Sequence, residues 1–159
     1  MSSQNNTPNT TSANWCLISV DIPVAASVER TWEALIHETN QWWLPDFRCV
    51  AAESVVSIDT APIGMGLHEV AGDEWLSWFQ VQMYLPSKLQ IHLVGNLAFN
   101  WGGPATSGLS LAVVNQDDKS VLQLREARFG RVEGSAMSTC QKDWGTLFTK
   151  GFQHYVESA

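Results

Sequence analysis

The pattern that most restricts the fold lies near the C-terminal end of the chain, where apolar residues recur with helical spacing. These residues are Met137, Cys140, Trp144, Leu147, Phe148, Gly151, Phe152 and Tyr155. Spacings of three, four and seven residues place side chains on one face of a helix. Residues 137–157 therefore predict one amphipathic helix about 30 Å long. Such a helix, laid against a sheet, either fills a core or covers a cavity.

The segment between residues 15 and 130 has the pattern of β-strands separated by turns. Alternation is clearest at residues 79–83, where we expect Phe79, Val81 and Met83 to face inward. Further strands are predicted near residues 15–22, 51–58, 67–71, 89–93, 109–113 and 122–128. Residues 117–119 predict a hairpin turn. Short connections between consecutive strands favour an antiparallel meander.

Two short helices are expected directly after the first strand. Ser27 has the position of an N-cap, and Val28, Trp32 and Leu35 then follow helical spacing to about residue 37. A second helical piece at residues 38–43 ends before Pro45. The whole pattern predicts an α+β fold in which a curved antiparallel sheet of about six to seven strands wraps a long C-terminal helix.

Composition restricts the organisation and the partners of the chain. Its 159 residues suit a single domain, which we place at residues 15–159, after a polar tail at residues 1–14 that we expect to be disordered. The net charge of −7 argues against a nucleic acid or an anionic membrane surface as a partner. No apolar run has the length of a membrane span.

The cysteines and histidines give no sign of a metal site. Cys16, Cys49 and Cys140 show no C-x-x-C spacing, and the four histidines are far apart in the sequence. We therefore expect reduced thiols in a cytoplasmic protein, no metal and no cofactor. The sequence also lacks the standard signatures of nucleophilic, metal-dependent and nucleotide-dependent catalysis.

Several motifs occur in an order that resembles a known superfamily. They are residues 22–35, with the sequence IPVAASVERTWEAL, the pair Trp42 and Trp43, residues 81–89 around Pro86, and Trp144 with Leu147. Together they resemble the START/Bet v-type helix-grip (SRPBCC) superfamily, and within it the branch named after the activator of the heat-shock protein 90 ATPase. The resemblance covers residues 15–157 and implies a helix-grip fold with a cavity between sheet and helix.

The chain departs from this family pattern at two places. Asp143 precedes the helix tryptophan where members often have glycine, and the segment Trp101-Gly102-Gly103-Pro104 has no family counterpart. The superfamily includes lipid carriers, hormone binders, cyclases and co-chaperone domains. A fold shared by such different proteins does not specify the function.

Glu126 and Arg128 are the sharpest candidates for chemistry. A period of two places them on the same strand face as Leu122 and Leu124, which should meet the helix. A buried acid and base must be paired or must contact a ligand. In that case Arg128 can anchor an acidic ligand, and Glu126 can bind it or act as a base. The alternative is that this strand end is exposed, or that a bulge reverses its faces.

Aromatic residues are the other candidates, because the chain has eight tryptophans. Trp101, in a glycine-rich loop, is the tryptophan expected to contact a ligand. Inward strand residues and the helix stripe are expected to supply the remaining cavity wall. The full set of expected ligand-binding residues is Trp101, Phe79, Val81, Met83, Leu111, Leu124, Glu126, Arg128, Trp144, Phe148, Phe152 and Tyr155.

Three functions are compatible with these features. The first is a binding domain for a small apolar, aromatic or lipid-like molecule, favoured by the aromatic content and the lack of catalytic motifs. The second is a cofactor-free enzyme of the cyclase or hydrolase kind, with a pocket carboxylate or histidine as base. The third is a chaperone-associated or regulatory protein that binds a partner through surface tryptophans.

Overall fold

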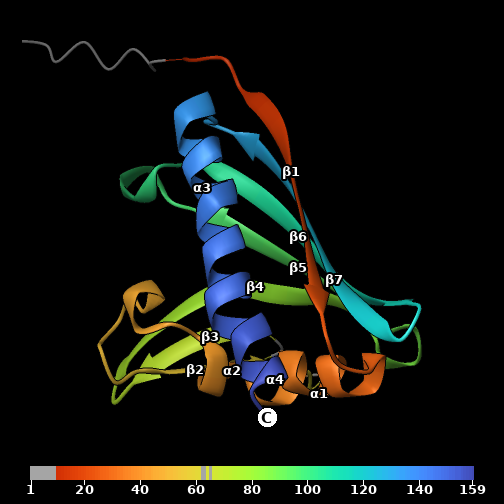
Figure 1. The fold of residues 1–159 in the computed structure, drawn as a ribbon. Coiled ribbons are helices and arrows are strands. Elements are labelled where there is room, and N and C mark those ends of the chain that lie inside the picture. Colours follow the sequence, from red (N-terminus) through yellow and green to blue (C-terminus); the bar gives the residue numbers. More distant parts are fainter. Residues whose placement is uncertain (1–9, 62–63, 65) are drawn as a thin grey trace, which may run out of the picture.

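A seven-stranded sheet curves around a long C-terminal helix in the computed structural model, which describes residues 10–61, 64 and 66–159 (Figure 1). The strands are β1 (Asn14–Val24), β2 (Val55–Asp59), β3 (Gly66–Ala71), β4 (Glu74–Leu85), β5 (Gln90–Leu97), β6 (Ala105–Gln116) and β7 (Lys119–Gly130). Their order in the sheet is β1-β7-β6-β5-β4-β3-β2, and every neighbouring pair is antiparallel. The predicted helix-grip architecture is confirmed.

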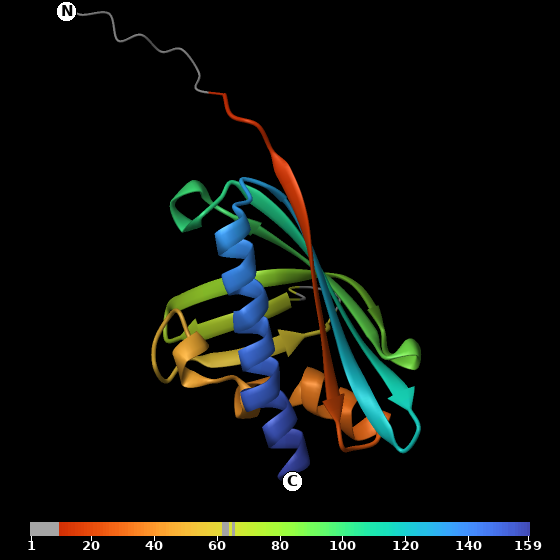
Figure 2. The same ribbon diagram turned by 45° about the horizontal axis from the view of Figure 1, so that its top comes forward.

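Short helices between β1 and β2 close one end of the sheet (Figure 2). They are α1 (Val28–His37), α2 (Thr39–Trp42) and the 3₁₀ turn η1 (Pro45–Phe47). Ser27 is the N-cap of α1, since its Oγ accepts a hydrogen bond of 3.2 Å from the Arg30 amide. Two further 3₁₀ turns, η2 (Pro86–Lys88) and η3 (Phe99–Trp101), connect strands at the sheet ends. Both predicted helices after the first strand are therefore present.

The C-terminal helix crosses the concave side of the sheet as one continuous element (Figure 1). It consists of α3 (Gly134–Thr146), a π-helical segment η4 (Leu147–Gln153) and α4 (His154–Glu157). The wider turns of η4 differ from the α-helical spacing that the sequence predicts. Gly151 allows the helix to pack closely on α2 here, because a Cβ at this position would collide with the carbonyl oxygen of Trp42.

The lower part of this helix fills a core. The rings of Phe148 and Phe152 lie 5.4 and 5.2 Å from the ring of Trp42, measured between centroids. All three side chains are buried, as are Val81, Leu111 and Leu124 on the sheet. All of these residues except Trp42 were expected to form the wall of a cavity, and instead they pack in the main core cluster. The helix therefore fills a core at one end, which leaves its other end to cover a cavity.

Strand β4 has two bulges that change which residues face the helix. The pairing with β3 skips Trp78, so that Trp78 and Phe79, although consecutive, both face inward. The pairing with β5 skips Gln82, which turns Met83 outward and Tyr84 inward. The prediction that Met83 faces the interior is therefore wrong, and the residue that takes its place is Tyr84, whose ring stacks on Trp32 at 6.1 Å.

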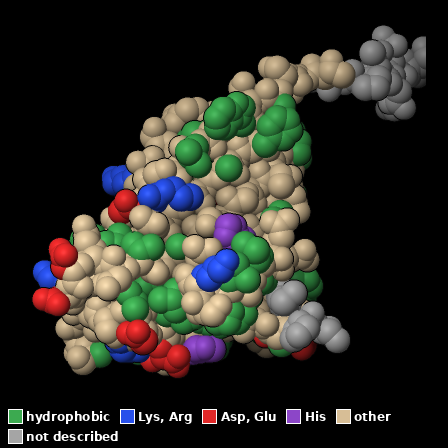
Figure 3. Space-filling model, turned by 90° about the vertical axis from the view of Figure 1, so that its right-hand side faces the viewer, with side chains coloured by type: hydrophobic (Ala, Val, Ile, Leu, Met, Phe, Trp, Pro, Cys, Tyr) green, Lys and Arg blue, Asp and Glu red, His purple; other side chains and the backbone are tan. Residues whose placement is uncertain are grey.

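The outer face of the sheet carries exposed apolar side chains near the start of β1 (Figure 3). Trp15 and Phe129 are register partners on β1 and β7, and they are 75% and 61% exposed. Leu17 lies on the same face. Trp15 is a surface tryptophan of the kind that the hypothesis of a protein partner requires, and binding of such a partner stays a prediction. No helix of the described residues is long and apolar enough to cross a membrane.

The start of β1 also bears on the predicted tail. Strand β1 begins at Asn14, which is one residue earlier than the sequence suggested. Residues 1–9 of the predicted tail lie outside the described residues.

Candidate functional site

A cavity of about 440 Å³ lies between the upper part of the C-terminal helix and the sheet. Its apolar wall includes Trp43, Phe47, Trp78, Phe79, Leu97, Ala136, Trp144 and Leu147, and its polar lining includes Asn96, Arg128, Thr139, Cys140 and Asp143. Pockets that bind small molecules typically have volumes of about 300–1,000 Å³ and mostly apolar walls. Size and lining are therefore those of a ligand-binding site.

Strands β4 and β5 make most of the sheet side of the cavity, to which β7 adds Arg128. The first bulge of β4 presents both Trp78 and Phe79, and Gly95 on β5 leaves space for the ring of Phe79. A Cβ at Gly95 would lie 2.8 Å from Cδ1 of that ring, which is closer than atoms in contact allow. The glycine therefore leaves room for the ring of Phe79 in the wall.

Glu69 is a buried carboxylate on β3 that fixes one side of the cavity. It accepts hydrogen bonds from the amides of Cys49 and Val50 at 2.7 and 2.8 Å and from the Ser54 hydroxyl at 2.6 Å. Its second oxygen accepts from the indole nitrogen of Trp78 at 3.1 Å. Glu69 thereby holds both a wall tryptophan and the segment that follows Phe47.

Hydrogen bonding keeps this buried group ionised. Burial alone would raise the pKa of Glu69, but the hydrogen bonds from Ser54, Val50 and Cys49 outweigh it and hold the pKa below its usual value of 4.5. The sequence analysis missed this residue. Glu69 lies two residues after Leu67 on a short strand, and this spacing was the signal that could have placed it on the same, inner face.

Glu126 on β7 is a second buried carboxylate, and it faces the C-terminal helix. Its side chain has no exposed surface. Its Oε2 accepts from the indole nitrogen of Trp144 at 2.6 Å, and its Oε1 accepts from Nη2 of Arg128 at 2.7 Å and from the Ser107 hydroxyl. The expectation that both charged residues face the helix is confirmed. The alternative of an exposed or reversed strand end is wrong.

The surroundings of Glu126 leave it little capacity to act as a base. Nε of Arg128 and the thiol of Cys140 donate to it as well, so that its two oxygens receive five donors. Burial would raise the pKa of Glu126, but the hydrogen bonds from Ser107 and Trp144, with the charge of Arg128, hold the pKa below its usual range. A carboxylate with these partners is better suited to positioning other groups than to accepting a proton.

Cys140 faces the cavity beside this pair. Burial and the negative charge of Glu126 raise the pKa of its thiol to about 11. The thiol therefore stays protonated at neutral pH, and a protonated thiol is a poor nucleophile. Among the described residues, no group of three metal-binding side chains is arranged to hold an ion.

The lowered pKa values of Glu69 and Glu126 predict that the protein loses stability in acid. Because these values are lower in the folded chain, the unfolded chain binds more protons at acidic pH. The stabilisation is complete above the usual value of 4.5 and is lost as the pH falls through the lower folded values. We expect the urea midpoint to fall as the pH drops below about 4.5, and to fall less in Glu126→Gln. If the urea midpoint fell equally with pH in the unchanged protein and in Glu126→Gln, this prediction would be contradicted.

The expected ligand-binding residues divide into groups in space. Phe79, Arg128 and Trp144 line the cavity, and Glu126 lies behind its wall. Phe47, Asn96 and Cys140 also line it, although the sequence analysis did not select them for this role. Phe47 comes from a 3₁₀ turn and Asn96 from a strand end, where periodicity gives no signal, whereas Cys140 belongs to the predicted helix stripe.

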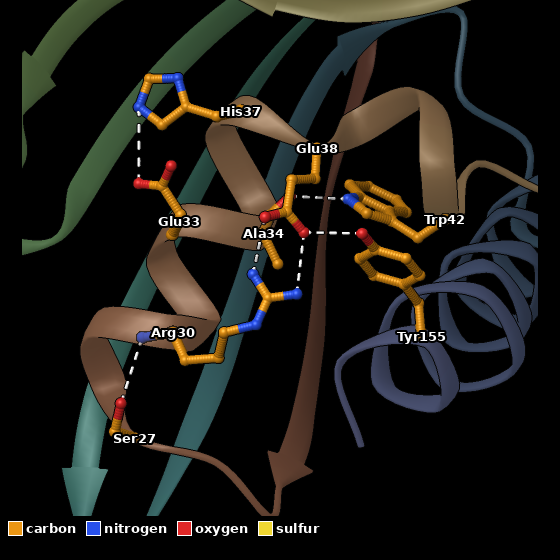
Figure 4. A network of polar contacts seen from close by, with 8 residues as sticks. All are labelled: Ser27, Arg30, Glu33, Ala34, His37, Glu38, Trp42 and Tyr155. Atoms are coloured by element: carbon orange, nitrogen blue, oxygen red, sulfur yellow. Dashed lines mark hydrogen bonds and ion pairs between the residues drawn. The ribbon is translucent and has the colours of Figure 1, made fainter. Parts of the chain in front are cut away.

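Tyr155 lies away from the cavity, at the end of the helix near α1 (Figure 4). Its hydroxyl donates to Oε2 of Glu38 at 2.8 Å, and the same carboxylate pairs with Arg30 at 2.8 Å. The expectation that Tyr155 forms part of the cavity wall is therefore wrong. Its role is to join the C-terminal helix to the end of α1.

Trp101 lies on η3 and is 53% exposed. It lines a smaller hollow of about 240 Å³ that shares Leu97, Arg128 and Ala136 with the main cavity. Contact between Trp101 and a ligand stays a prediction.

Comparisons with known proteins identify the fold. No family model matches the chain, and no curated protein matches it in sequence. The crystal structure of Ara h 8.0201 superposes with a TM-score of 0.65 at 8% identity, covering 92% of this chain and 100% of that one. The Aha1 dimer from Colwellia psychrerythraea gives a TM-score of 0.54 at 16% identity, over 89% and 96% of the two chains.

A third similar structure comes from a larger protein. DynU16, from the dynemicin biosynthetic locus, gives a TM-score of 0.61 at 15% identity, covering 89% of this chain and 47% of that one. Identities this low establish the fold and not the activity. The chain thus has the helix-grip fold, which it shares with Ara h 8.0201 and with the Aha1 dimer.

Proposed function

We propose that this protein binds a small, apolar, planar molecule in the cavity beneath the upper part of its C-terminal helix. The observation that carries the proposal is a cavity of about 440 Å³ whose aromatic walls are held open by hydrogen bonds. Trp78 donates to Glu69, Trp144 donates to Glu126, and Trp43 donates to the carbonyl oxygen of Phe47 at 3.2 Å. Because each indole has a fixed partner, the rings are kept from collapsing into the space.

Fixed walls favour binding, because little conformational entropy is lost when a ligand enters. The ring centroids of Trp43 and Trp78 lie 6.1 Å apart, and those of Phe79 and Trp144 lie 6.4 Å apart. These pairs line the cavity and offer apolar surface to a flat molecule. A carrier or receptor role follows more directly than catalysis, since the buried carboxylate is saturated with donors.

A location inside the cell belongs to the same proposal. All three cysteines are free in the structure, which suits a reducing compartment such as the cytoplasm. The finding supports a cytoplasmic location.

The proposal is tested by titrating the protein with uncharged bicyclic aromatic molecules, such as 2-ethylnaphthalene, and following binding by calorimetry and by amide NMR shifts. We expect saturable binding with shifts at residues that line the cavity. Ala136→Phe, which places a ring at the cavity, should weaken binding at least about tenfold. Gln141→Phe is the matched control, because Gln141 lies on the same helix but lines a different hollow.

The result that would overturn the proposal is also defined. Absence of binding across the whole series, in protein shown to be folded by its NMR spectrum, would exclude this function. An equal loss of affinity in Ala136→Phe and Gln141→Phe would place the ligand outside the cavity.

A further inference from the structure

The guanidinium group of Arg128 is only partly used within the protein. Its Nε and Nη2 donate to Glu126, and Nη2 also contacts Sγ of Cys140 at 3.4 Å. Nη1 donates to no residue in the part of the chain that the structure describes. No buried side-chain nitrogen there lacks a partner, so Nη1 has accessible surface. Arg128 is 17% exposed and lines the cavity.

The charges around the cavity do not favour an anion. The positive charge of Arg128 is matched by Glu126, which lies 2.7 Å away and is fully buried. The other charged residue in the lining is Asp143, which adds a negative charge. A carboxylate ligand would therefore lose its hydration without meeting net positive charge, which is costly in an apolar site. This differs from the acidic ligand that the sequence alone suggested for Arg128.

From these two observations we propose that the ligand is an uncharged aromatic molecule with a hydrogen-bond acceptor, of the aryl ketone kind, whose oxygen accepts from Nη1 of Arg128. This inference rests on the proposed function, since it names the chemistry of the molecule that the same cavity takes. The apolar part of the ligand lies among the rings of Trp78, Phe79 and Trp144. The oxygen accepts from Nη1, the guanidinium nitrogen that donates to none of the described residues.

The fixed position of the donor makes it selective. Glu126 holds the guanidinium through two of its nitrogens, so the orientation of Nη1 is set before the ligand arrives. A ligand without an acceptor would cover Nη1 and leave it without a hydrogen bond, which carries a desolvation cost. The cavity thus distinguishes a ketone from a hydrocarbon of the same shape.

The test uses three naphthalenes that differ only in the substituent at position 2: acetyl, ethyl and carboxylate. Dissociation constants are measured by calorimetry at neutral pH. We expect 2-acetylnaphthalene to bind about tenfold more tightly than 2-ethylnaphthalene, because a hydrogen bond to a charged donor has about this effect. We expect 2-naphthoate to bind more weakly than the ketone.

A paired variant assigns the preference to Arg128. Glu126→Gln with Arg128→Met removes the donor and keeps the site electrically neutral, and the ratio of the ketone and hydrocarbon constants should fall to about one. The matched control makes the same two replacements in the neighbouring exposed pair, as Glu133→Gln with Arg131→Met. The control should keep the preference for the ketone, and the fold of each variant is checked by its NMR spectrum.

The outcomes separate this inference from the function on which it rests. Equal binding of ketone and hydrocarbon, or tightest binding of the carboxylate, would overturn the inference while leaving a binding protein. A ketone preference that survives in the Glu126 and Arg128 variant would overturn it as well. Binding of none of the three naphthalenes would count against the proposed function itself.

Discussion

Arg128→Met is expected to lower the free energy of unfolding by about 3 kcal/mol, because it leaves a buried carboxylate without its cation. The side chain of Glu126 has no exposed surface, and it accepts two hydrogen bonds from Arg128. Desolvation of the carboxylate is then no longer offset by a positive charge. Urea unfolding at neutral pH, followed by far-ultraviolet circular dichroism, measures this loss.

Two controls distinguish pairing from general disruption. The double variant Glu126→Gln with Arg128→Met should recover more than half of the loss, since a neutral amide can still accept from Trp144 and donate to the Ser107 hydroxyl. Arg125→Met, on the same strand, removes an exposed pair with Asp21 and should cost less than about 1 kcal/mol. Equal losses in the single and double variants would contradict the interpretation.

Glu69→Leu is expected to have an effect of similar size, about 3 kcal/mol, because it removes the acceptor of four donors at once. The amides of Cys49 and Val50, the Ser54 hydroxyl and the Trp78 indole all donate to this carboxylate. We also expect faster hydrogen exchange at the two amides and a weaker affinity for cavity ligands, since Trp78 loses its anchor. Denaturant unfolding and exchange followed by NMR measure the two effects.

Glu69→Gln is the matched control for this prediction. A glutamine keeps one carbonyl oxygen that can accept from the amides, so both the stability and the slow exchange should be largely retained. A loss in Glu69→Gln equal to that in Glu69→Leu would show that the charge, and not the hydrogen bonding, is the dominant contribution.

The sequence predicted those parts of the fold that depend on local spacing. The stripe on the C-terminal helix, the N-cap at Ser27 and the turn between β6 and β7 each follow from residues that are close in the chain. The inward position of Glu126 follows from regular alternation along β7, which has no register shift with either neighbour. Local periodicity is a sufficient guide where the pairing is regular.

The parts that the sequence did not predict depend on pairing between distant segments. The outward position of Met83 results from a bulge against β5, and no feature of residues 79–83 alone reveals it. Tyr155 belongs to the same stripe as Trp144, but Trp144 lies on the part of the helix that covers the cavity, whereas Tyr155 lies beyond the core, in the last turns. A stripe indicates that a face is covered and does not indicate what covers it.

The bulge at Trp78 has a consequence for how the binding site can change between related proteins. The pairing of β3 and β4 skips Trp78, so removal of this residue would not change the register of its neighbours. Leu76 and Phe79 would still face inward, and Ser77 would still lie opposite His68. One side of the cavity is thus built from an inserted residue. A deletion or insertion of a single codon here would enlarge or reduce the space for a ligand while the remaining sheet keeps its register.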